Sequence, residues 1–217
     1  PNPRPNQRTT HWSEPLRRLL RHHKRDTLIT FGVSCLNAVA FYMLLSYMPT
    51  YVKEELGFSQ GTATMATSVT LVVYIAAIFL MGRLSDFFGR RRMLVSACMA
   101  FIVLSIPLFL AMTHAPGLPA IVACQIIFAI MLTANDGTLA TFLAESFPTS
   151  VRYSGFALSF NGANALLGGT TPFIVTWLIG VSGSSLAPAV YLTAVSAMAM
   201  VSILASRVLH SSDLTEP

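Results

Sequence analysis

The feature that most constrains this chain is a pair of long uncharged apolar segments on either side of a short basic turn. The segments are 63–81 and 93–113, and neither contains Asp, Glu, Lys or Arg. Each is about 20 residues long, which is the length that an α-helix needs to cross the hydrocarbon core of a bilayer. Basic residues in short loops stay on the cytoplasmic side during insertion. The sequence therefore predicts two transmembrane helices joined by a cytoplasmic turn.

The rest of the chain repeats this pattern, so we expect an all-α membrane protein with six transmembrane helices. Of its 217 residues, 53% are hydrophobic and 11% are charged, which is about half the charged fraction of a soluble domain. We expect a six-helix bundle over 27–207, a cytoplasmic linker with a short amphipathic basic helix over 1–26, and a cytoplasmic tail over 208–217. The expected helices are 27–52, 63–81, 93–113, 118–144, 153–180 and 186–206.

The distribution of basic residues predicts the orientation of the bundle. Six spans put both termini on the same side, and 13 of the 14 Lys and Arg residues then lie on that side, with Lys53 alone on the other. This asymmetry is typical of a multi-pass protein of the cell (inner) membrane with both termini cytoplasmic. Topology and anionic lipid explain the net charge of +5 better than nucleic acid does. We expect the lipid bilayer as a partner, and no nucleic acid.

The residue types that carry redox or hydrolytic chemistry do not gather in this sequence. Cys35, Cys98 and Cys124 lie inside apolar segments without ligand-like spacing, so we interpret them as packing residues. All five histidines lie in the expected loops, which leaves no histidine to bind haem within the bundle. No nucleophile–base pair or metal-ligand cluster is recognisable. We therefore expect neither an enzyme nor a protein that binds a metal or an organic cofactor.

The basic turn has the pattern Gly82-x-x-x-Asp86-x-x-Gly89-Arg90-Arg91. The two glycines permit a tight turn, and the aspartate can accept hydrogen bonds from free amides at a helix start. The arginines can bind phosphate or carboxylate groups. This spacing resembles the signature turn of the major facilitator superfamily of secondary transporters, which joins two helices of that family on the cytoplasmic side.

A second expected cytoplasmic turn runs from Glu145 to Arg152. Its Glu-x6-Arg spacing and the Phe-Pro-Thr and Arg-Tyr-Ser-Gly stretches within 147–155 resemble the metabolite–proton symporters, which include proline/betaine, citrate, oxoglutarate and shikimate carriers. The resemblance implies that this chain is the carboxy-terminal six-helix half of a twelve-helix transporter. It also implies two inverted three-helix repeats, with an amino-terminal six-helix half as the partner of this chain.

The same resemblance implies a conformational charge cluster at the cytoplasmic end of the bundle. When the inner side is closed, Arg90 and Arg91 would approach Glu145, with Arg152 completing the cluster, while Asp86 would face a helix end of the partner half. We expect such pairs to act as a latch between conformations, because exposed ion pairs contribute little to fold stability.

Two polar residues lie deep inside the expected spans. Asn37 is roughly 16 Å from the start of the first span, and Asp136 is about 13 Å from the cytoplasmic end of the fourth. A carboxylate within the membrane is costly and by default marks a transport pathway or a binding site. The alternative is a structural carboxylate that is hydrogen-bonded to a neighbouring helix. As a pathway residue, Asp136 would carry a proton or pair with a group of the partner half.

The fifth expected span is rich in asparagine and glycine. Asn161 and Asn164 lie along one face at helical spacing, and Gly162, Gly168 and Gly169 are small enough for close helix approach. The two asparagines suit a substrate cavity and interhelical hydrogen bonding about equally well.

These features favour alternating-access transport of a small organic acid or zwitterion, coupled to a proton, with no other cofactor. The candidate cavity residues are Asn37, Asp136, Asn161 and Asn164. The alternative function is that of a non-transporting or separately encoded membrane half that needs a partner half.

Overall fold

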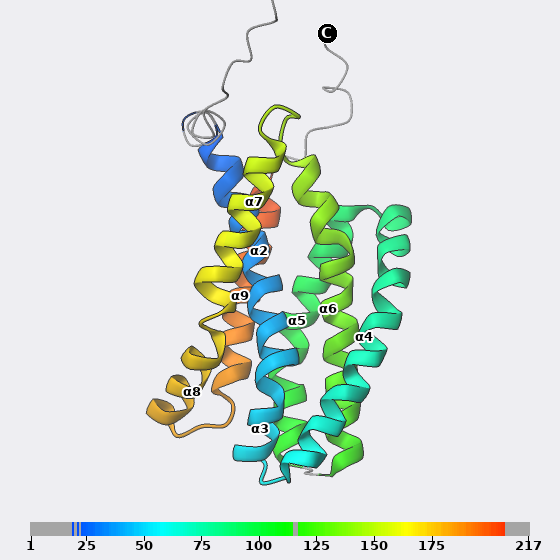
Figure 1. Ribbon diagram of the computed structural model, residues 1–217, viewed down its shortest axis with the longest axis vertical. Helices are drawn as coiled ribbons and strands as arrows, with labels where there is room; N and C mark the ends of the chain where they lie inside the picture. Colours follow the sequence, from blue (N-terminus) through cyan, green and yellow to red (C-terminus); the bar gives the residue numbers. More distant parts are fainter. Residues whose placement is uncertain (1–18, 20, 22, 115–116, 207–217) are drawn as a thin grey trace, which may run out of the picture.

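All regular structure in the described part of the chain is helical, and it forms six spans (Figure 1). The computed structural model describes residues 19, 21, 23–114 and 117–206. The spans are α2 (Lys24–Phe41) with the π-helix η1 (Tyr42–Tyr47) and α3 (Met48–Glu54); α4 (Gln60–Phe88); α5 (Arg90–His114); α6 (Leu118–Glu145); α7 (Arg152–Ala163) with the π-helix η2 (Asn164–Gly168) and α8 (Thr171–Ser182); and α9 (Ala187–Ala205). Six long apolar helices confirm the all-α membrane fold.

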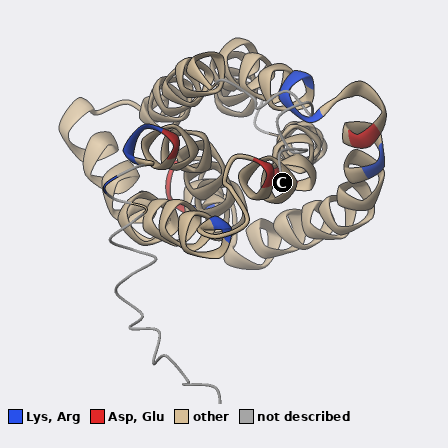
Figure 2. Cartoon of the chain, turned by 90° about the horizontal axis from the view of Figure 1, so that it is seen from above, with Lys and Arg blue, Asp and Glu red and all other residues tan. Residues whose placement is uncertain are grey.

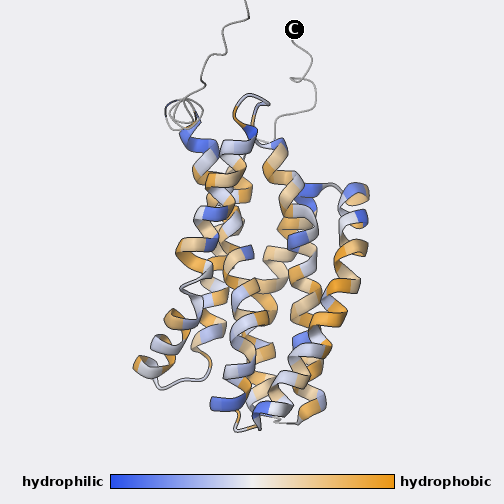
Figure 3. Ribbon diagram, in the orientation of Figure 1, coloured by the Kyte–Doolittle hydropathy of each residue, from blue (hydrophilic) through white to orange (hydrophobic). Residues whose placement is uncertain are grey.

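The two ends of the bundle are hydrophilic and its middle is hydrophobic (Figure 3). Viewed from above, Lys, Arg, Asp and Glu occupy only a few short stretches of the described helices (Figure 2). This distribution is what a bilayer requires, because charged groups are stable at the interfaces and costly in the hydrocarbon core.

The contacts among the six spans show an internal two-fold symmetry, which relates the first three spans to the last three. The second span, α4, packs mainly on the fourth, α6, and the fifth span packs in the same way on the first. The third span, α5, packs on α6, as the sixth, α9, packs on α2, while α5 and α9 pack on each other. Exchanging spans one, two and three for four, five and six therefore reproduces the contacts. Because each set contains three spans, the two sets cross the membrane in opposite directions, as expected of inverted repeats.

The buried share of each span follows the same symmetry. Within the most apolar stretch of each span, 17% of the residues are buried in both the second and the fifth span, and 44% in both the third and the sixth. The first and fourth spans are the most buried, at 67% and 50%. The second and fifth spans therefore lie at the two edges of the bundle, and the first and fourth lie at its centre (Figure 1).

Aromatic rings fill the centre of the bundle between the first, third and fourth spans. Tyr51 stands edge-on to Phe109, with their ring centroids 5.2 Å apart, and Phe109 contacts Phe128 at 5.5 Å. All three side chains are almost fully buried. Such aromatic pairs add to the stability that burial of their area provides.

The turn between α4 and α5 consists of Gly89 alone. Its φ of 90° lies in the left-handed region, which a residue with a side chain rarely adopts. Gly82, which we expected to belong to this turn, lies instead inside α4, because the helix continues to Phe88. There Gly82 packs against Gly137 of α6: a Cβ added to Gly137 would lie 2.9 Å from the backbone nitrogen of Gly82. The glycine of the turn pattern thus serves helix packing.

The expected amphipathic helix near the amino terminus lies mostly outside the described residues, and so does the expected tail over 208–217. Of the apolar side chains expected on that helix, Leu19 is described. It is fully buried in a small cluster with Phe147 and Val151 of the turn between α6 and α7. This apolar contact joins the segment before α2 to the turn between α6 and α7.

Candidate functional site

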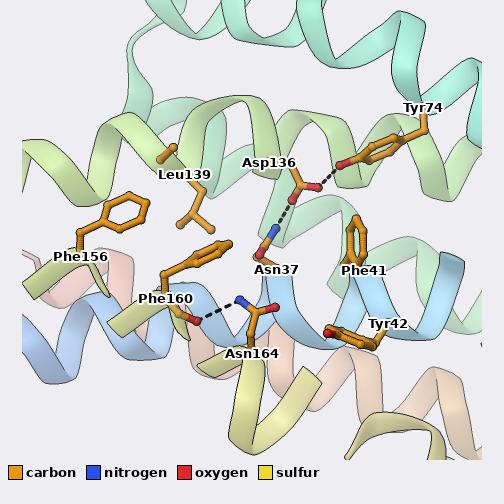
Figure 4. Close-up of a pocket in the computed structure, with 10 residues that line it drawn as sticks. Asn37, Phe41, Tyr42, Tyr74, Asp136, Leu139, Phe156, Phe160 and Asn164 are labelled. Atoms are coloured by element: carbon orange, nitrogen blue, oxygen red, sulfur yellow. Dashed lines mark hydrogen bonds between the residues drawn. The ribbon is translucent and has the colours of Figure 1, made fainter. Parts of the chain in front are cut away.

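A cavity of about 280 Å³ opens between the two central spans and the two edge spans, near the middle of the bundle. Four of the six spans contribute side chains to it (Figure 4). The residues that line it are Asn37, Phe41, Tyr42, Tyr74, Asp136, Leu139, Ala140, Phe156, Phe160 and Asn164. A concave, mostly apolar site with a few converging polar groups is the usual form of a small-molecule site.

The carboxylate of Asp136 lies at the centre of the polar part of this cavity. The hydroxyl of Tyr74 on α4 donates a hydrogen bond to it at 2.5 Å, and the side-chain amide of Asn37 on α2 donates a second one to its other oxygen (Figure 4). The three residues come from three different spans. Both donors are neutral, and no Lys, Arg or His is among the residues that line the cavity.

Aromatic rings surround the carboxylate. Phe41 and Tyr42 follow Asn37 on the first span, and Phe41 stands edge-on to Tyr74 with a centroid separation of 6.3 Å. On the fifth span Phe156 and Phe160 contact each other at 5.7 Å. In Figure 4, Phe160 and Phe41 lie on opposite sides of the bonded Asn37 and Asp136.

The first and fifth spans each contain a π-helical segment beside the cavity. η1 begins at Tyr42 and η2 begins at Asn164, so both segments start with a residue that lines the cavity. The segments also meet: a Cβ added to Gly168 would lie 2.8 Å from the ring of Tyr42. Short π-helical turns within α-helices occur frequently at functional sites.

Three of the four candidate cavity residues line this cavity, and one does not. Asn37, Asp136 and Asn164 face into it, and the amide of Asn164 donates to the carbonyl oxygen of Phe160 at 2.9 Å. Asn161 is exposed and is not among the lining residues. Helix residues three apart are separated by about 60° around the axis, and the packing of the fifth span turns only the second asparagine inward.

The contacts of Asp136 support both interpretations of this residue, as a pathway residue and as a structural carboxylate. Its carboxylate bonds to two neighbouring helices, as a structural carboxylate would, and it also faces a cavity. The rings and Tyr74 were missed in the sequence, because aromatic residues are common in apolar spans. The one available signal was a spacing of four residues, which separates Phe41 from Asn37, Phe160 from Asn164, and Phe156 from Phe160.

The expected charge cluster is smaller than the resemblance implied. Arg90 donates to Glu145 at 2.8 Å and to Asp86 at 3.0 Å, so one guanidinium joins α4, α5 and α6 beside the turn between α4 and α5. Arg91 instead donates to the carbonyl oxygen of Leu204 at 3.2 Å. Successive helix residues point about 100° apart, so Arg91 faces α9 when Arg90 faces α6.

The remaining members of the expected cluster and the glycines also differ from expectation in part. Arg152 donates to the backbone oxygen of Phe147 at 3.3 Å, within its own turn. Gly168 makes the close interhelical approach expected of it. A Cβ at Gly162 would meet the ring of Phe31 only at ordinary contact distance, and the nearest atoms to Gly169 belong to its own span.

Six apolar spans, four of which surround a cavity that holds a carboxylate, are the architecture expected of a membrane transporter. The sequence model of the Major Facilitator Superfamily matches residues 30–216. The chain therefore belongs to the Major Facilitator Superfamily, and the family resemblance of its two turns is confirmed. Its relatives are transporters and not enzymes.

Several proteins with transporter names are similar to this chain. The ectoine/proline transporter ProP of Corynebacterium glutamicum is 34% identical over 86% of this chain and 37% of its own length. The glycine betaine/proline/ectoine/pipecolic acid transporter OusA of Dickeya dadantii is 31% identical over 85% of this chain and 36% of its own length. The proline/betaine transporter of Escherichia coli K12 is 33% identical over 82% of this chain. The chain thus spans little more than a third of the length of these relatives.

Proposed function

We propose that this chain is one six-helix half of a secondary active transporter that moves a small zwitterion or organic acid by alternating access. The observation that carries the proposal is the Asp136 carboxylate, which faces a cavity within an otherwise apolar bundle and bonds across three spans. Ionisable groups at such a depth are retained where they serve a pathway or a binding site.

The two edge spans support the existence of a partner half. Only 17% of the most apolar stretch of α4, and the same share of the fifth span, is buried in this chain. Large apolar side chains such as Phe79 of α4 and Phe173 of α8 are about three-quarters exposed. Both edge spans contribute to the cavity, so a second six-helix half packed against them would complete its wall. In this arrangement the two halves rock about the cavity between inward-open and outward-open states.

The names of the relatives favour a zwitterion over an organic acid. Proline, betaine, ectoine and pipecolic acid appear in those names, and each carries both a cationic nitrogen and a carboxylate. The resemblance to metabolite–proton symporters suggests a proton as the coupling ion. The coupling proton would be carried by Asp136 or by a group outside this chain.

The bundle is proposed to lie in the cell (inner) membrane with both termini in the cytoplasm. Single cysteines at Gln60 and at Thr149, in a background without the three native cysteines, test this orientation. Both residues are exposed, at opposite ends of the bundle. An impermeant thiol reagent added to intact cells should label the first and not the second. The opposite result would reverse the orientation.

Uptake measurements on the complete gene product test the function. In a bacterial strain without its own proline and betaine uptake, radiolabelled proline and glycine betaine should accumulate, and a protonophore should abolish the accumulation. Citrate and oxoglutarate serve as comparison solutes. Accumulation that persists with the protonophore but requires sodium would show that sodium, and not a proton, is the coupling ion. If none of the four solutes accumulates, the proposed substrate classes are refuted.

A further inference from the structure

We infer that this half of the transporter binds the cationic end of its substrate, with an ammonium group seated between the Asp136 carboxylate and the aromatic rings of the cavity. The inference rests on the proposed transport function and assigns one end of the substrate to this chain.

The first argument is the charge of the cavity. When ionised, Asp136 has two neutral hydrogen-bond donors, Asn37 and Tyr74, and no cation among the residues that line the cavity. A buried charge is costly unless an opposite charge accompanies it. A substrate ammonium group supplies that charge, and it leaves again when the substrate is released. A permanent lysine or arginine at this place would instead neutralise the carboxylate and weaken its hold on a cation.

The second argument is the hydrogen-bonding capacity of the carboxylate. An ionised carboxylate offers about four acceptor positions, and the two donors occupy one position on each oxygen. The donors come from different spans, so they fix the orientation of the carboxylate while its other positions stay available. A secondary ammonium group, as in proline, can therefore donate to Asp136 without displacing Asn37 or Tyr74.

The third argument is the aromatic lining. A quaternary ammonium group, as in glycine betaine, has no N–H to donate, and it is held by charge and by the faces of aromatic rings within about 6 Å. Five aromatic residues line this cavity, from three spans: Phe41, Tyr42, Tyr74, Phe156 and Phe160. In Figure 4, rings stand on both sides of Asp136. The cavity thus offers a hydrogen-bond acceptor for one type of ammonium group and aromatic rings for the other.

Two consequences follow for the complete transporter. We expect the carboxylate end of the substrate to be bound outside this cavity, because none of the described residues that line it is Lys, Arg or His. An anion without an ammonium group, such as citrate, would meet only the negative charge of Asp136 here. In symport, the substrate and the coupling ion are bound at the same time. If Asp136 balances the charge of the ammonium group, another residue must carry the coupling proton.

The test compares two substrates in variants that remove one ring. Phe160→Leu in the complete gene product should raise the KM of glycine betaine about tenfold. It should raise the KM of proline less than about threefold, because proline keeps its hydrogen bonds to Asp136. Phe160→Tyr keeps a ring and should keep the ratio of the two KM values. Val103→Ala, which shortens an exposed side chain of α5 outside the cavity and away from the two edge spans, is the control and should change neither value.

Tetramethylammonium, a quaternary cation without a carboxylate, gives a second readout. It should compete with proline uptake in the parent protein and more weakly in Phe160→Leu. Phe41→Leu takes the place of that variant if Phe160→Leu does not reach the membrane. Equal changes in both KM values, together with no competition by tetramethylammonium, would overturn the inference while leaving the transport function intact. If the protein takes up neither solute, the proposed function fails. Calorimetric titration of the purified protein with tetramethylammonium then decides the inference, since absence of binding overturns it.

Discussion

The two pairs of spans that surround the cavity pack in different ways. The second and fourth spans, α4 and α6, are uninterrupted helices of 29 and 28 residues. In the inverted repeats the first span takes the place equivalent to α6 and the fifth span the place equivalent to α4. Yet the first and fifth spans each contain a π-helical segment, and the fifth is further interrupted at 169–170. The α4–α6 pair is therefore the regular pair, and the pair formed by the first and fifth spans is the irregular pair.

The contacts inside each pair follow this difference. In the regular pair two backbones touch, because Gly137 of α6 leaves no room for a Cβ beside Gly82 and the carbonyl oxygen of Ile78. In the irregular pair the close contact is between Gly168 and the ring of Tyr42. A side chain can rotate away, whereas a helix backbone cannot. We conclude that the regular pair behaves as a rigid unit and that the irregular pair can adjust its shape.

Polar contacts hold each pair together and also join the two pairs. Within the regular pair, Thr70 donates to Gln125 at 3.1 Å, and within the irregular pair the hydroxyls of Thr30 and Ser159 are 2.7 Å apart. The hydrogen bond from Asn37 to Asp136 crosses from the irregular pair to the regular one. A substrate that binds at Asp136 therefore binds where a rigid and an adjustable unit meet, which suits a site that must close and open.

The largest expected effect comes from filling the backbone contact of the regular pair. In Gly137→Ala, the new Cβ would lie 2.9 Å from the nitrogen of Gly82 and 3.2 Å from the carbonyl oxygen of Ile78, so two helices must move apart. Overpacking of this kind costs about 1–3 kcal/mol. We expect a lower midpoint of thermal unfolding for the purified protein in detergent, measured by the loss of its monodisperse chromatographic peak.

Gly180→Ala is the matched control for this variant. Gly180 is a helical residue of α8 with no atom within 4 Å of an added Cβ. Since alanine favours a helix over glycine by up to about 1 kcal/mol, the control should unfold at the same temperature or a slightly higher one. Equal midpoints for the two variants would show that the regular pair has room to adjust and would remove the contrast between the pairs.

A smaller effect is expected from the same substitution in the irregular pair. In Gly168→Ala the new Cβ would lie 2.8 Å from the ring of Tyr42, which can swing away, and 3.4 Å from the Cβ of Ala38. We expect a loss of about 1 kcal/mol or less in unfolding free energy. A change in substrate KM should accompany it, because the Tyr42 ring lines the cavity. Thermal unfolding and proline uptake measure the two effects.

The double variant Gly168→Ala with Tyr42→Ala sharpens this prediction. Removal of the ring removes the clash, so the stability loss of the double variant should be smaller than the sum of the two single losses, as a double-mutant cycle measures. Additive losses would mean that the ring and the glycine do not interact, and that the irregular pair is held by other contacts.

The smallest effect on stability is expected at the end of the regular pair where Arg90 joins α4 to α6. Arg90 pairs with Glu145 and Asp86 where the carboxylates are at least half exposed, and exposed pairs contribute about 0.2–1 kcal/mol. We expect Glu145→Ala and Arg90→Ala to leave insertion and thermal unfolding nearly unchanged but to reduce uptake strongly. A change of about 1.4 kcal/mol in the balance of inward-open and outward-open states shifts their ratio tenfold.

Two further variants test whether the Arg90–Glu145 contact acts as a conformational latch or whether these charges only set the orientation of the chain in the membrane. Arg92→Ala removes an exposed arginine near the start of α5 and should keep normal uptake. The exchange Glu145→Arg with Arg90→Glu should recover part of the activity if the contact is direct. Normal uptake in both single variants would mean that the arginines of this turn only set the orientation of the chain.

Part of the candidate site could be predicted from the sequence, and the physical reason is the bilayer. A polar side chain in an apolar span must find a partner or a cavity, so Asn37 and Asp136 stood out by their depth alone, and both line the cavity. Asn161 and Asn164 could not be distinguished as cavity candidates from the sequence. Only the rotation of the fifth span, set by its packing and its π-helical segment, separates the inward asparagine from the exposed one.

The sequence by itself determined the all-α membrane fold, the six spans and the family. Length, hydropathy and turn spacing are local properties, and a bilayer converts them directly into helices. Tertiary structure alone decided which side chains meet. It placed Tyr74 on Asp136, gathered the aromatic rings, moved Gly82 from a turn to a helix contact and sent Arg91 to α9. These outcomes depend on helix rotation and register, which arise from contacts between residues far apart in the chain.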